Sequence, residues 1–167
     1  MQRRQWIFLG VVLAGLFLDL GTKAWATETL AEGGAIPLAS NLELRYAQNE
    51  GAAFSMLERA PAEVRGGVFG LAALIAVLVM TWLTRRGHGG AAFVWGAPLV
   101  VAGALGNSVD RVRWGYVVDF IRVHWDSAIP FLGRAWPTFN VADIAVLAGA
   151  ILLLWDSRRS APSPAPG

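Results

Sequence analysis

Two aspartates, Asp119 and Asp143, stand where an unpaired charge is costly and where hydrolysis could use it. Asp119 lies in the apolar run from Val117 to Ile121, and Asp143 comes just before the uncharged run 144–155. Two nearby carboxylates share one proton, because both cannot easily ionise. One can then act as a base on water while the other, protonated, polarises a scissile carbonyl. If the Asp119 segment folds over the start of the last apolar run, the two residues form such a pair.

A second charged group is carried by a single helical face. Asp19 and Lys23 are four residues apart, which makes them neighbours on a helix. An internal ion pair that lowers the cost of two charges near a membrane surface is one interpretation. Lys23 is also the only lysine, since the other thirteen basic residues are arginine. A lone lysine indicates a site that needs a compact ammonium rather than a planar guanidinium.

Three of the four asparagines adjoin carboxylates. Asn107 precedes Asp110 by three residues, Asn140 precedes Asp143 by three, and Asn49 lies in a predicted turn before a glutamate. The structural alternatives are an N-cap for Asn140 and a C-terminal helix cap for Asn107. Neither cap explains why the asparagines gather at the acids, so a shared polar site remains the second interpretation.

Asp110 is followed directly by Arg111, with Arg113 two residues further on. Adjacent opposite charges at the end of an apolar run are typical of a structural ion pair. We therefore predict that Asp110 pairs with one of these arginines.

The composition excludes a soluble domain and several kinds of active site. Of 167 residues, 55% are hydrophobic and 16% charged, and the mean hydropathy is +0.48. Soluble domains have about a quarter of charged residues, so the composition indicates a membrane protein. Cysteine is absent, which excludes disulfides, thiolate metal sites and cysteine nucleophiles. His88 and His124 lack metal-ligand spacing, and we expect neither a metal nor a cofactor.

Four runs can cross a bilayer, whose apolar core of about 30 Å needs roughly 20 helical residues. The predicted spans are 6–25, 66–84, 89–109 and 139–155. Arginine pairs at 3–4, 85–86 and 158–159 fall on one side of such a bundle. Positive charge beside span ends favours the cytoplasm, so both termini are predicted to be cytoplasmic. The polar clusters then converge at the outer face.

The first span has a second interpretation as a cleavable secretory signal. Arg3 and Arg4 precede an apolar stretch that ends in Ala24-Trp25-Ala26, the A-x-A form of a signal cleavage site. Asp19 and Lys23 just before that site disfavour cleavage. The residue pattern alone leaves both interpretations open.

The first outer segment predicts a small surface sheet. Residues 42–47 alternate between apolar and polar side chains, as in a half-buried strand. Asn49-Glu-Gly51 has turn chemistry and precedes the apolar stretch 52–57, so we predict a hairpin or curved sheet. Pro61 is expected to open a short amphipathic interfacial helix that carries Glu63 and Arg65.

The second outer segment and the tail are predicted in the same way. Residues 116–123 are rich in β-branched and aromatic side chains and predict a strand, and 124–137 predict an interfacial loop. Small-residue pairs at Gly66 and Gly70 and at Ala102 and Gly106 predict close helix packing. Residues 1–159 are expected to form one domain, and the Ser/Ala/Pro-rich tail 160–167 is expected to be disordered.

Five blocks of this sequence resemble, in order and spacing, the signature blocks of bacterial lipoprotein signal peptidase, also called signal peptidase II. The blocks are Asp19-Leu-Gly-Thr-Lys23, Asn49-Glu-Gly-Ala-Ala-Phe-Ser55, Gly106-Asn-Ser-Val-Asp-Arg111, Val117-Val-Asp-Phe120 and Phe139-Asn-Val-Ala-Asp143. Each block alone is weak evidence, whereas the five together cover nearly the whole chain. Ile144 departs from the family pattern, in which a small residue is more usual.

The resemblance implies a fold and a reaction. The fold would be a membrane all-α bundle of four transmembrane helices with a small periplasmic β-cradle. The reaction would be that of a cofactor-free aspartyl endopeptidase of the bacterial inner membrane. It would remove the signal peptide of a prolipoprotein just before the diacylglyceryl-modified cysteine. The chain is expected to act as a monomer among membrane lipids, without nucleic acid.

The resemblance also assigns residues. Asp119 and Asp143 match the catalytic pair. Polar residues around the substrate are matched by Asn49, Asn107, Arg111 and Asn140, and supporting charges by Asp19, Lys23 and Asp110.

Two functions of other classes serve as rivals. A small proton-coupled transporter or channel would use intramembrane carboxylates as relay groups, but it predicts charges at mid-span. The second and third predicted spans are uncharged across their centres. A non-catalytic membrane scaffold would leave Asp119 in its apolar strand unexplained.

Overall fold

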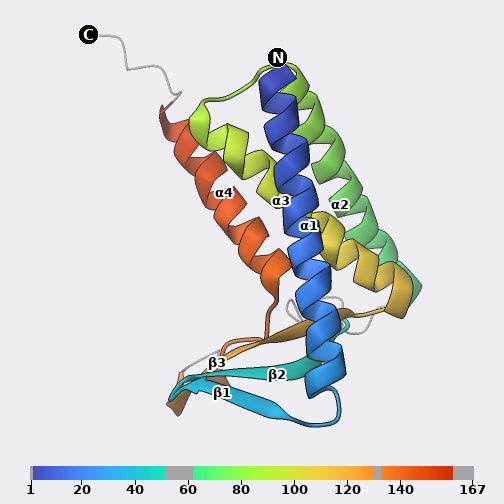
Figure 1. Ribbon diagram of the computed structural model, residues 1–167, viewed down its shortest axis with the longest axis vertical. Helices are drawn as coiled ribbons and strands as arrows, with labels where there is room; N and C mark the ends of the chain where they lie inside the picture. Colours follow the sequence, from blue (N-terminus) through green and yellow to red (C-terminus); the bar gives the residue numbers. More distant parts are fainter. Residues whose placement is uncertain (1, 52–61, 130–132, 160–167) are drawn as a thin grey trace.

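The computed structural model of the chain describes residues 2–51, 62–129 and 133–159. Within these residues, four helices form a bundle and four strands form a sheet at one end of it (Figure 1). The elements in chain order are α1 (Gln2–Leu30), β1 (Ala35–Ala39), β2 (Leu42–Asn49), α2 (Ala62–Arg85), α3 (Ala91–Trp114), β3 (Val117–Ile129), β4 (Gly133–Ala135) and α4 (Val141–Arg159). The sheet end of the bundle lies opposite the end where α1 begins and α4 finishes (Figure 1).

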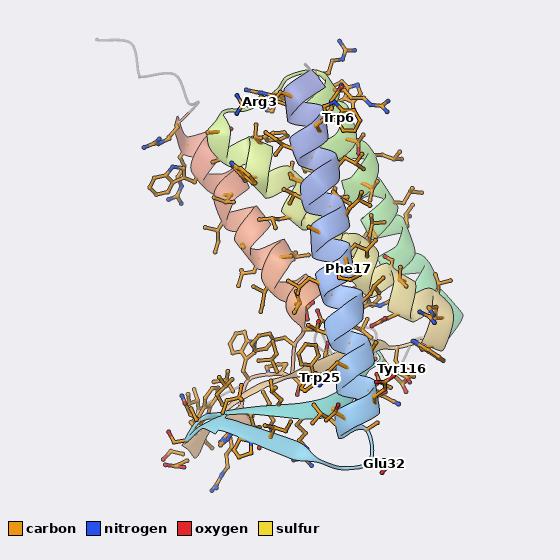
Figure 2. All side chains as sticks on the ribbon, in the orientation of Figure 1. Arg3, Trp6, Phe17, Trp25, Glu32 and Tyr116 are labelled. Atoms are coloured by element: carbon orange, nitrogen blue, oxygen red, sulfur yellow. The ribbon has the colours of Figure 1, made fainter. Side chains whose placement is uncertain are left out.

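The helices match the four predicted runs, except that α3 and α4 each begin two residues later than predicted. Three helices are long and apolar enough to cross a membrane, and the corresponding segments are Arg3–Leu30, Gly66–Arg85 and Ala91–Trp114. On the outward face of α1, Phe17 is 82% exposed and Trp6 is 69% exposed (Figure 2). Large apolar side chains left outside a bundle need an apolar surrounding, which a bilayer provides. The described part of the chain is therefore that of a membrane protein. α4 is shorter and carries Asp143 and Asp156 near its two ends.

α3 is the central helix and packs against each of the other three. Small residues allow its close approach to α4. A Cβ on Gly96 would lie 2.9 Å from the Gly149 carbonyl oxygen, and a Cβ on Gly103 would collide with the Ala142 carbonyl oxygen. A Cβ on Gly15 of α1 would lie 2.8 Å from a side chain of α3. That side chain is Ala102, and a Cβ on Gly106 would collide with Asp19 of α1, so the packing predicted at Ala102 and Gly106 is confirmed.

The same prediction is wrong for Gly66 and Gly70. Both lie on α2, and a Cβ on either would meet no described atom within 4 Å. The α2 window most like a membrane span is not buried within the described structure. A small-residue pattern alone does not require a partner helix to be present.

The sheet is antiparallel, with strand order β1-β2-β3-β4. β1 was not predicted. It forms a hairpin with β2 on the N-terminal side of β2, whereas the predicted hairpin used the stretch after Asn49. β3 continues to Ile129, because its second half pairs with β4. The predicted interfacial loop over 124–137 is therefore wrong for 124–129 and for 133–135, which form the end of β3 and β4.

Three further predictions concern the stretch 52–57, the helix expected at Pro61 and the C-terminal tail. The stretch 52–57, predicted to complete a hairpin, lies outside the described residues, as does the tail 160–167. The predicted separate interfacial helix is wrong where it is described, because α2 starts at Ala62 and continues without a break into the span.

The lower end of α1 supports the sheet. Ala26 and Leu30 are buried against Phe120 of β3, and Trp25 meets Phe120 edge to face with ring centroids 6.5 Å apart. α1 runs through Ala24-Trp25-Ala26 as regular helix, with Ala26 fully buried. Residues 24–26 are therefore part of a regular helix that packs on the sheet, not an extended segment.

At the opposite end, charged side chains tie the helix ends together. Asp156 of α4 accepts hydrogen bonds from the backbone N–H groups of Gly90, at 3.0 Å, and Phe93, at 3.3 Å. These groups belong to the first turn of α3, where N–H groups lack helical partners. Arg4 of α1 donates to the carbonyl oxygen of Gly87 at 3.0 Å and to those of the two residues that follow.

Gly103→Ala is expected to destabilise the bundle by about 1–3 kcal/mol, because the added Cβ forces α3 away from the α4 backbone. The cost should appear as a lower thermal unfolding midpoint in detergent. Gly10→Ala is the matched control, since a Cβ on Gly10 meets nothing within 4 Å. An equal or higher midpoint for Gly103→Ala would contradict the close contact.

Candidate active site

A short bridge between β3 and the start of α4 brings the two candidate acids together. Phe139 exchanges backbone hydrogen bonds with Ile121: its N–H donates to the Ile121 oxygen at 3.0 Å, and its oxygen accepts from the Ile121 N–H at 2.8 Å. Asp119 lies two residues before this bridge on β3, and Asn140 lies one residue after it. The condition set from the sequence, that the Asp119 segment folds over the start of the last helix, is met.

Asp119 is buried, with 1% of its surface exposed. Its Oδ1 accepts a hydrogen bond of 2.7 Å from the Asn140 side-chain amide, and its Oδ2 accepts one of 2.9 Å from Asn49. Asn49 is itself fixed by a turn, because its Oδ1 accepts from the Gly51 N–H at 2.8 Å. Two amides from different elements therefore hold both carboxylate oxygens.

Asp143 lies in the first turn of α4 and is half-buried. Asn140 and Asp143 bind each other reciprocally: the Asp143 N–H donates to Asn140 Oδ1 at 3.0 Å, and the Asn140 N–H donates to Asp143 Oδ2 at 3.1 Å. This is the geometry of a capping box. Asp143 Oδ1 also accepts a hydrogen bond of 2.8 Å from the Asn107 side-chain amide. Asn140 is thus both the predicted helix cap and a direct partner of Asp119.

The electrostatic environment favours a proton on Asp119. The pKa of Asp119 is raised to about 7, chiefly by burial and also by the charge of Asp143. Hydrogen bonds from Asn49 and Asn140 and the charge of Lys23 act in the opposite direction. Near neutral pH, a carboxyl group with this pKa is present in both forms.

Lys23 is surrounded by three acceptors. Its Nζ lies 2.8 Å from Asp19 Oδ2 and 3.1 Å from Asp110 Oδ2, and it donates to Asn107 Oδ1 at 2.9 Å. These contacts match the three N–H bonds of an ammonium. Because an ammonium can only donate, Asn107 turns its oxygen toward Lys23 and its NH2 group toward Asp143. Lys23 therefore orients the amide that binds one of the two acids.

Asp19 and Asp110 also hold backbone segments in place. Asp19 Oδ1 accepts a hydrogen bond of 2.8 Å from the N–H of Ala142 in α4. Asp110 Oδ2 accepts one of 3.0 Å from the N–H of Val118 in β3. Asp19 Oδ2 faces the Lys23 ammonium at 2.8 Å, and this ion pair compensates the charge of the buried carboxylate. Gly106 leaves room for this carboxylate, because a Cβ there would collide with it.

Arg111 lies at the side of the acids. Its guanidinium interacts electrostatically with Asp143 and Asp119, donates to the Asn107 carbonyl oxygen at 3.2 Å, and lies 4.2 Å from the centre of the Phe69 ring of α2. Phe69 is thus a neighbour of the site that the sequence did not single out. Within the described residues, Asp110 pairs with Lys23, so the predicted Asp110 pair with Arg111 or Arg113 is wrong.

The residues selected from the sequence therefore come together from α1, β2, α3, β3 and the start of α4. They are Asp19, Lys23, Asn49, Asn107, Asp110, Arg111, Asp119, Asn140 and Asp143. The alternative of Asn107 as a C-terminal cap is wrong, since α3 continues to Trp114 and ends at Gly115 in the left-handed region, with φ of 80°.

Other participants were missed. The backbone N–H groups of Ala142 and Val118 and the bridge made by Phe139 have no side-chain signature, and Phe69 carried no polar signal. Gly106 was noted only for packing. Among the described residues, no group of three or more His, Cys, Asp or Glu is arranged to hold a metal ion.

Comparison with known proteins identifies the family. The family model described as signal peptidase (SPase) II matches residues 11–159. The chain belongs to the signal peptidase II family. The lipoprotein signal peptidase of Ralstonia nicotianae is 39% identical over 154 residues, covering 92% of this chain and 84% of the relative. That of Nitratidesulfovibrio vulgaris is 36% identical over 162 residues, covering 96% and 94%.

A solved structure has a similar fold. A bacterial membrane enzyme determined by the in meso method superposes with a TM-score of 0.73 at 25% identity, over 92% of this chain and 94% of that one. The fold of this signal peptidase is therefore that of a membrane enzyme. The resemblance noted in the five sequence blocks is confirmed.

Lys23→Arg is expected to lower the thermal unfolding midpoint, because a planar guanidinium cannot direct three N–H bonds at the acceptors around Nζ. Lys23→Ala should cost more, about 3–5 kcal/mol, since it leaves two buried carboxylates without their cation. Arg122→Lys is the control: its pair with Glu43 is partly exposed and should contribute less than about 1 kcal/mol. A parental midpoint for Lys23→Arg would show that charge alone suffices.

Proposed function

We propose that the protein removes the signal peptide of prolipoproteins by aspartyl hydrolysis, with Asp119 and Asp143 as the catalytic pair. Family membership carries the reaction class, and the relatives are named as lipoprotein signal peptidases. The single observation that supports the residue assignment is the shared amide. Asn140 binds Asp119 through its side chain and Asp143 through its backbone, which holds two acids beside one another.

The two acids differ in a way that suggests their roles. Asp119 is buried and has the raised pKa, so we assign it the proton. Asp143 is half-buried and lies in the first turn of α4, where the helix dipole favours negative charge. We therefore assign Asp143 as the base, since water from outside can reach it.

The reaction then follows with its protons accounted for. Asp143 takes a proton from water as the oxygen attacks the scissile carbonyl carbon, and Asp119 gives its proton to the carbonyl oxygen. The tetrahedral intermediate collapses when the leaving nitrogen receives a proton from Asp143, the C–N bond breaks, and the new carboxyl group returns a proton to Asp119. Arg111 and the three asparagines hold the acids and the substrate in this geometry.

The position of the pair fits a substrate anchored by lipid. Asp119 and Asp143 lie where α3 and α4 meet the sheet, at one end of the apolar bundle. A cleavage site just before a diacylglyceryl-modified cysteine lies at the membrane surface, because its acyl chains are in the bilayer. Water for hydrolysis is available at that depth.

We further propose four spans in the bacterial inner membrane, with α4 as the fourth, both termini cytoplasmic, and the acids on the periplasmic side. The arginine pairs at 3–4, 85–86 and 158–159 support this orientation. The protein is proposed to act as a monomer, without a cofactor.

Asp119→Asn and Asp143→Asn should each reduce cleavage of a lipidated precursor by roughly 10²–10⁴-fold, because each removes a proton-transfer group while keeping the shape. The double variant should be little worse than either single variant, since the acids act on one proton. Cleavage is scored by gel shift in detergent. Asp126→Asn, an exposed acid in β3, is the control and should retain activity. Substantial cleavage by a folded single variant would refute the pair.

The cleavage rate should fall as pH rises through about 7, because Asp119 with its raised pKa then loses the proton that polarises the carbonyl. In Asn49→Ala this loss should occur at higher pH, even if the maximal rate is lower. The reason is that the Asn49 hydrogen bond stabilises charged Asp119 and lowers its pKa. An unchanged alkaline limb in the folded variant would argue against Asp119 as the acid.

The orientation predicts which fusions place a reporter in the periplasm. A reporter that works only there should be active after Ser127 and inactive after Gly87, the link between α2 and α3. Activity at Gly87 would reverse the orientation and with it the side of the acids.

A further inference from the structure

A cavity lies beside the Lys23–Asp110 ion pair. It has a volume of about 330 Å³ and lies among the lower half of α1, the end of α3, and strands β2 and β3. Lys23 and Asp110 contribute to its wall, whereas Asp119 and Asp143 do not. Tyr116, which also lines it, lies beside the lower part of α1 (Figure 2). The proposed peptidase reaction makes no use of this cavity.

Two side chains of opposite charge line the cavity. Glu28 comes from α1 and Arg113 from the last turn of α3. Both are exposed, and neither forms an ion pair with any described residue. The charges of Lys23 and Asp110, in contrast, satisfy one another. The cavity therefore offers one uncommitted cation and one uncommitted anion from different helices.

Two tyrosines add a hydrogen-bond donor. The hydroxyls of Tyr46 and Tyr116 lie 3.3 Å apart, and Tyr46 accepts a further hydrogen bond of 3.3 Å from Gln48. Two hydroxyl groups carry two protons, and the contact between them uses one. The other proton is free to be donated to a ligand beside Arg113.

The cavity lies at the depth of a membrane surface. It is at the outer end of two apolar helices, and Trp114, 56% exposed, lies on its rim with the Arg113 guanidinium 5.3 Å from its ring centre. Tryptophan and tyrosine are enriched at this level of a bilayer. Leu20, Ala24 and Val118 supply apolar wall toward the bundle.

The geometry points to a binding site for the headgroup of a zwitterionic phospholipid with a primary ammonium, that is, a phosphoethanolamine headgroup. Its phosphate would be held by Arg113 and the free tyrosine proton, and its ammonium by Glu28. Arginine suits phosphate because its N–H groups form a fork of matching geometry. The acyl chains would extend along the apolar surfaces of α1 and α3. The site goes beyond the proposed peptidase function and needs no substrate.

Native mass spectrometry of the detergent-purified protein can test this site with three added lipids of equal chain length: phosphatidylethanolamine, phosphatidylcholine and phosphatidylglycerol. One copy of phosphatidylethanolamine should bind about tenfold more tightly than either of the others, the ratio for one charge-assisted hydrogen bond. Glu28→Gln should remove the preference over phosphatidylcholine. Arg113→Gln should weaken the binding of all three lipids.

Glu32→Gln and Arg134→Gln serve as matched controls, because they make the same changes at exposed positions outside the cavity. Both should bind the lipids as the parent does. Equal affinity for the three lipids, or a preference that survives Glu28→Gln, would overturn the proposal. Soluble phosphoethanolamine that competes as well as the lipid would also overturn it, since the site would then not be a lipid site. Binding is measured without substrate, so failure of the peptidase assignment would not affect the result.

Discussion

The buried ammonium of Lys23 is the interaction on which the rest of the site depends. It lies within about 3 Å of acceptors from Asp19, Asp110 and Asn107, and it is 3% exposed. Asp19 also accepts a hydrogen bond from a backbone N–H of α4, and Asp110 accepts one from a backbone N–H of β3. One charge thereby fixes α1, α3, α4 and the start of β3 relative to each other. Without it, two carboxylates would remain in a dry environment, which costs several kcal/mol.

Asparagine side chains transmit this order to the two acids. Each amide has a donor and an acceptor end, so fixing one end fixes the other. Asn107 receives Lys23 and Asn140 at its oxygen and donates to Asp143, and Asn140 donates to Asp119. A neutral connector can bind an acid in either protonation state more readily than a cation, which would hold it ionised. Such a network keeps the positions of both carboxyl groups fixed.

At both ends of the bundle, side chains form hydrogen bonds with backbone groups at the helix ends. At the far end, Asp156 and Arg4 satisfy backbone groups at the helix ends, which joins α1, α3 and α4. At the sheet end, the backbone N–H groups in the first turn of α4 donate to side chains: that of Asp143 to Asn140, and that of Ala142 to Asp19 of α1. Close packing of α3 on α4 through Gly96, Gly103 and Gly149 connects the ends rigidly. The acids therefore rest on helices and a paired strand rather than on a loop.

The sequence by itself determined the residue types, the apolar runs and the local spacings. Asp19 with Lys23, and Asn140 with Asp143, are neighbours because helical geometry makes residues three or four apart adjacent. Only the tertiary structure decided that Asp110 pairs with Lys23 rather than Arg111, and that a Cβ on Gly66 or Gly70 would meet no atom of the described residues within 4 Å. It also decided that Phe139 bridges to β3. These contacts join residues distant in the chain, and their geometry follows from how α1, α3 and β3 pack together, which no local pattern encodes.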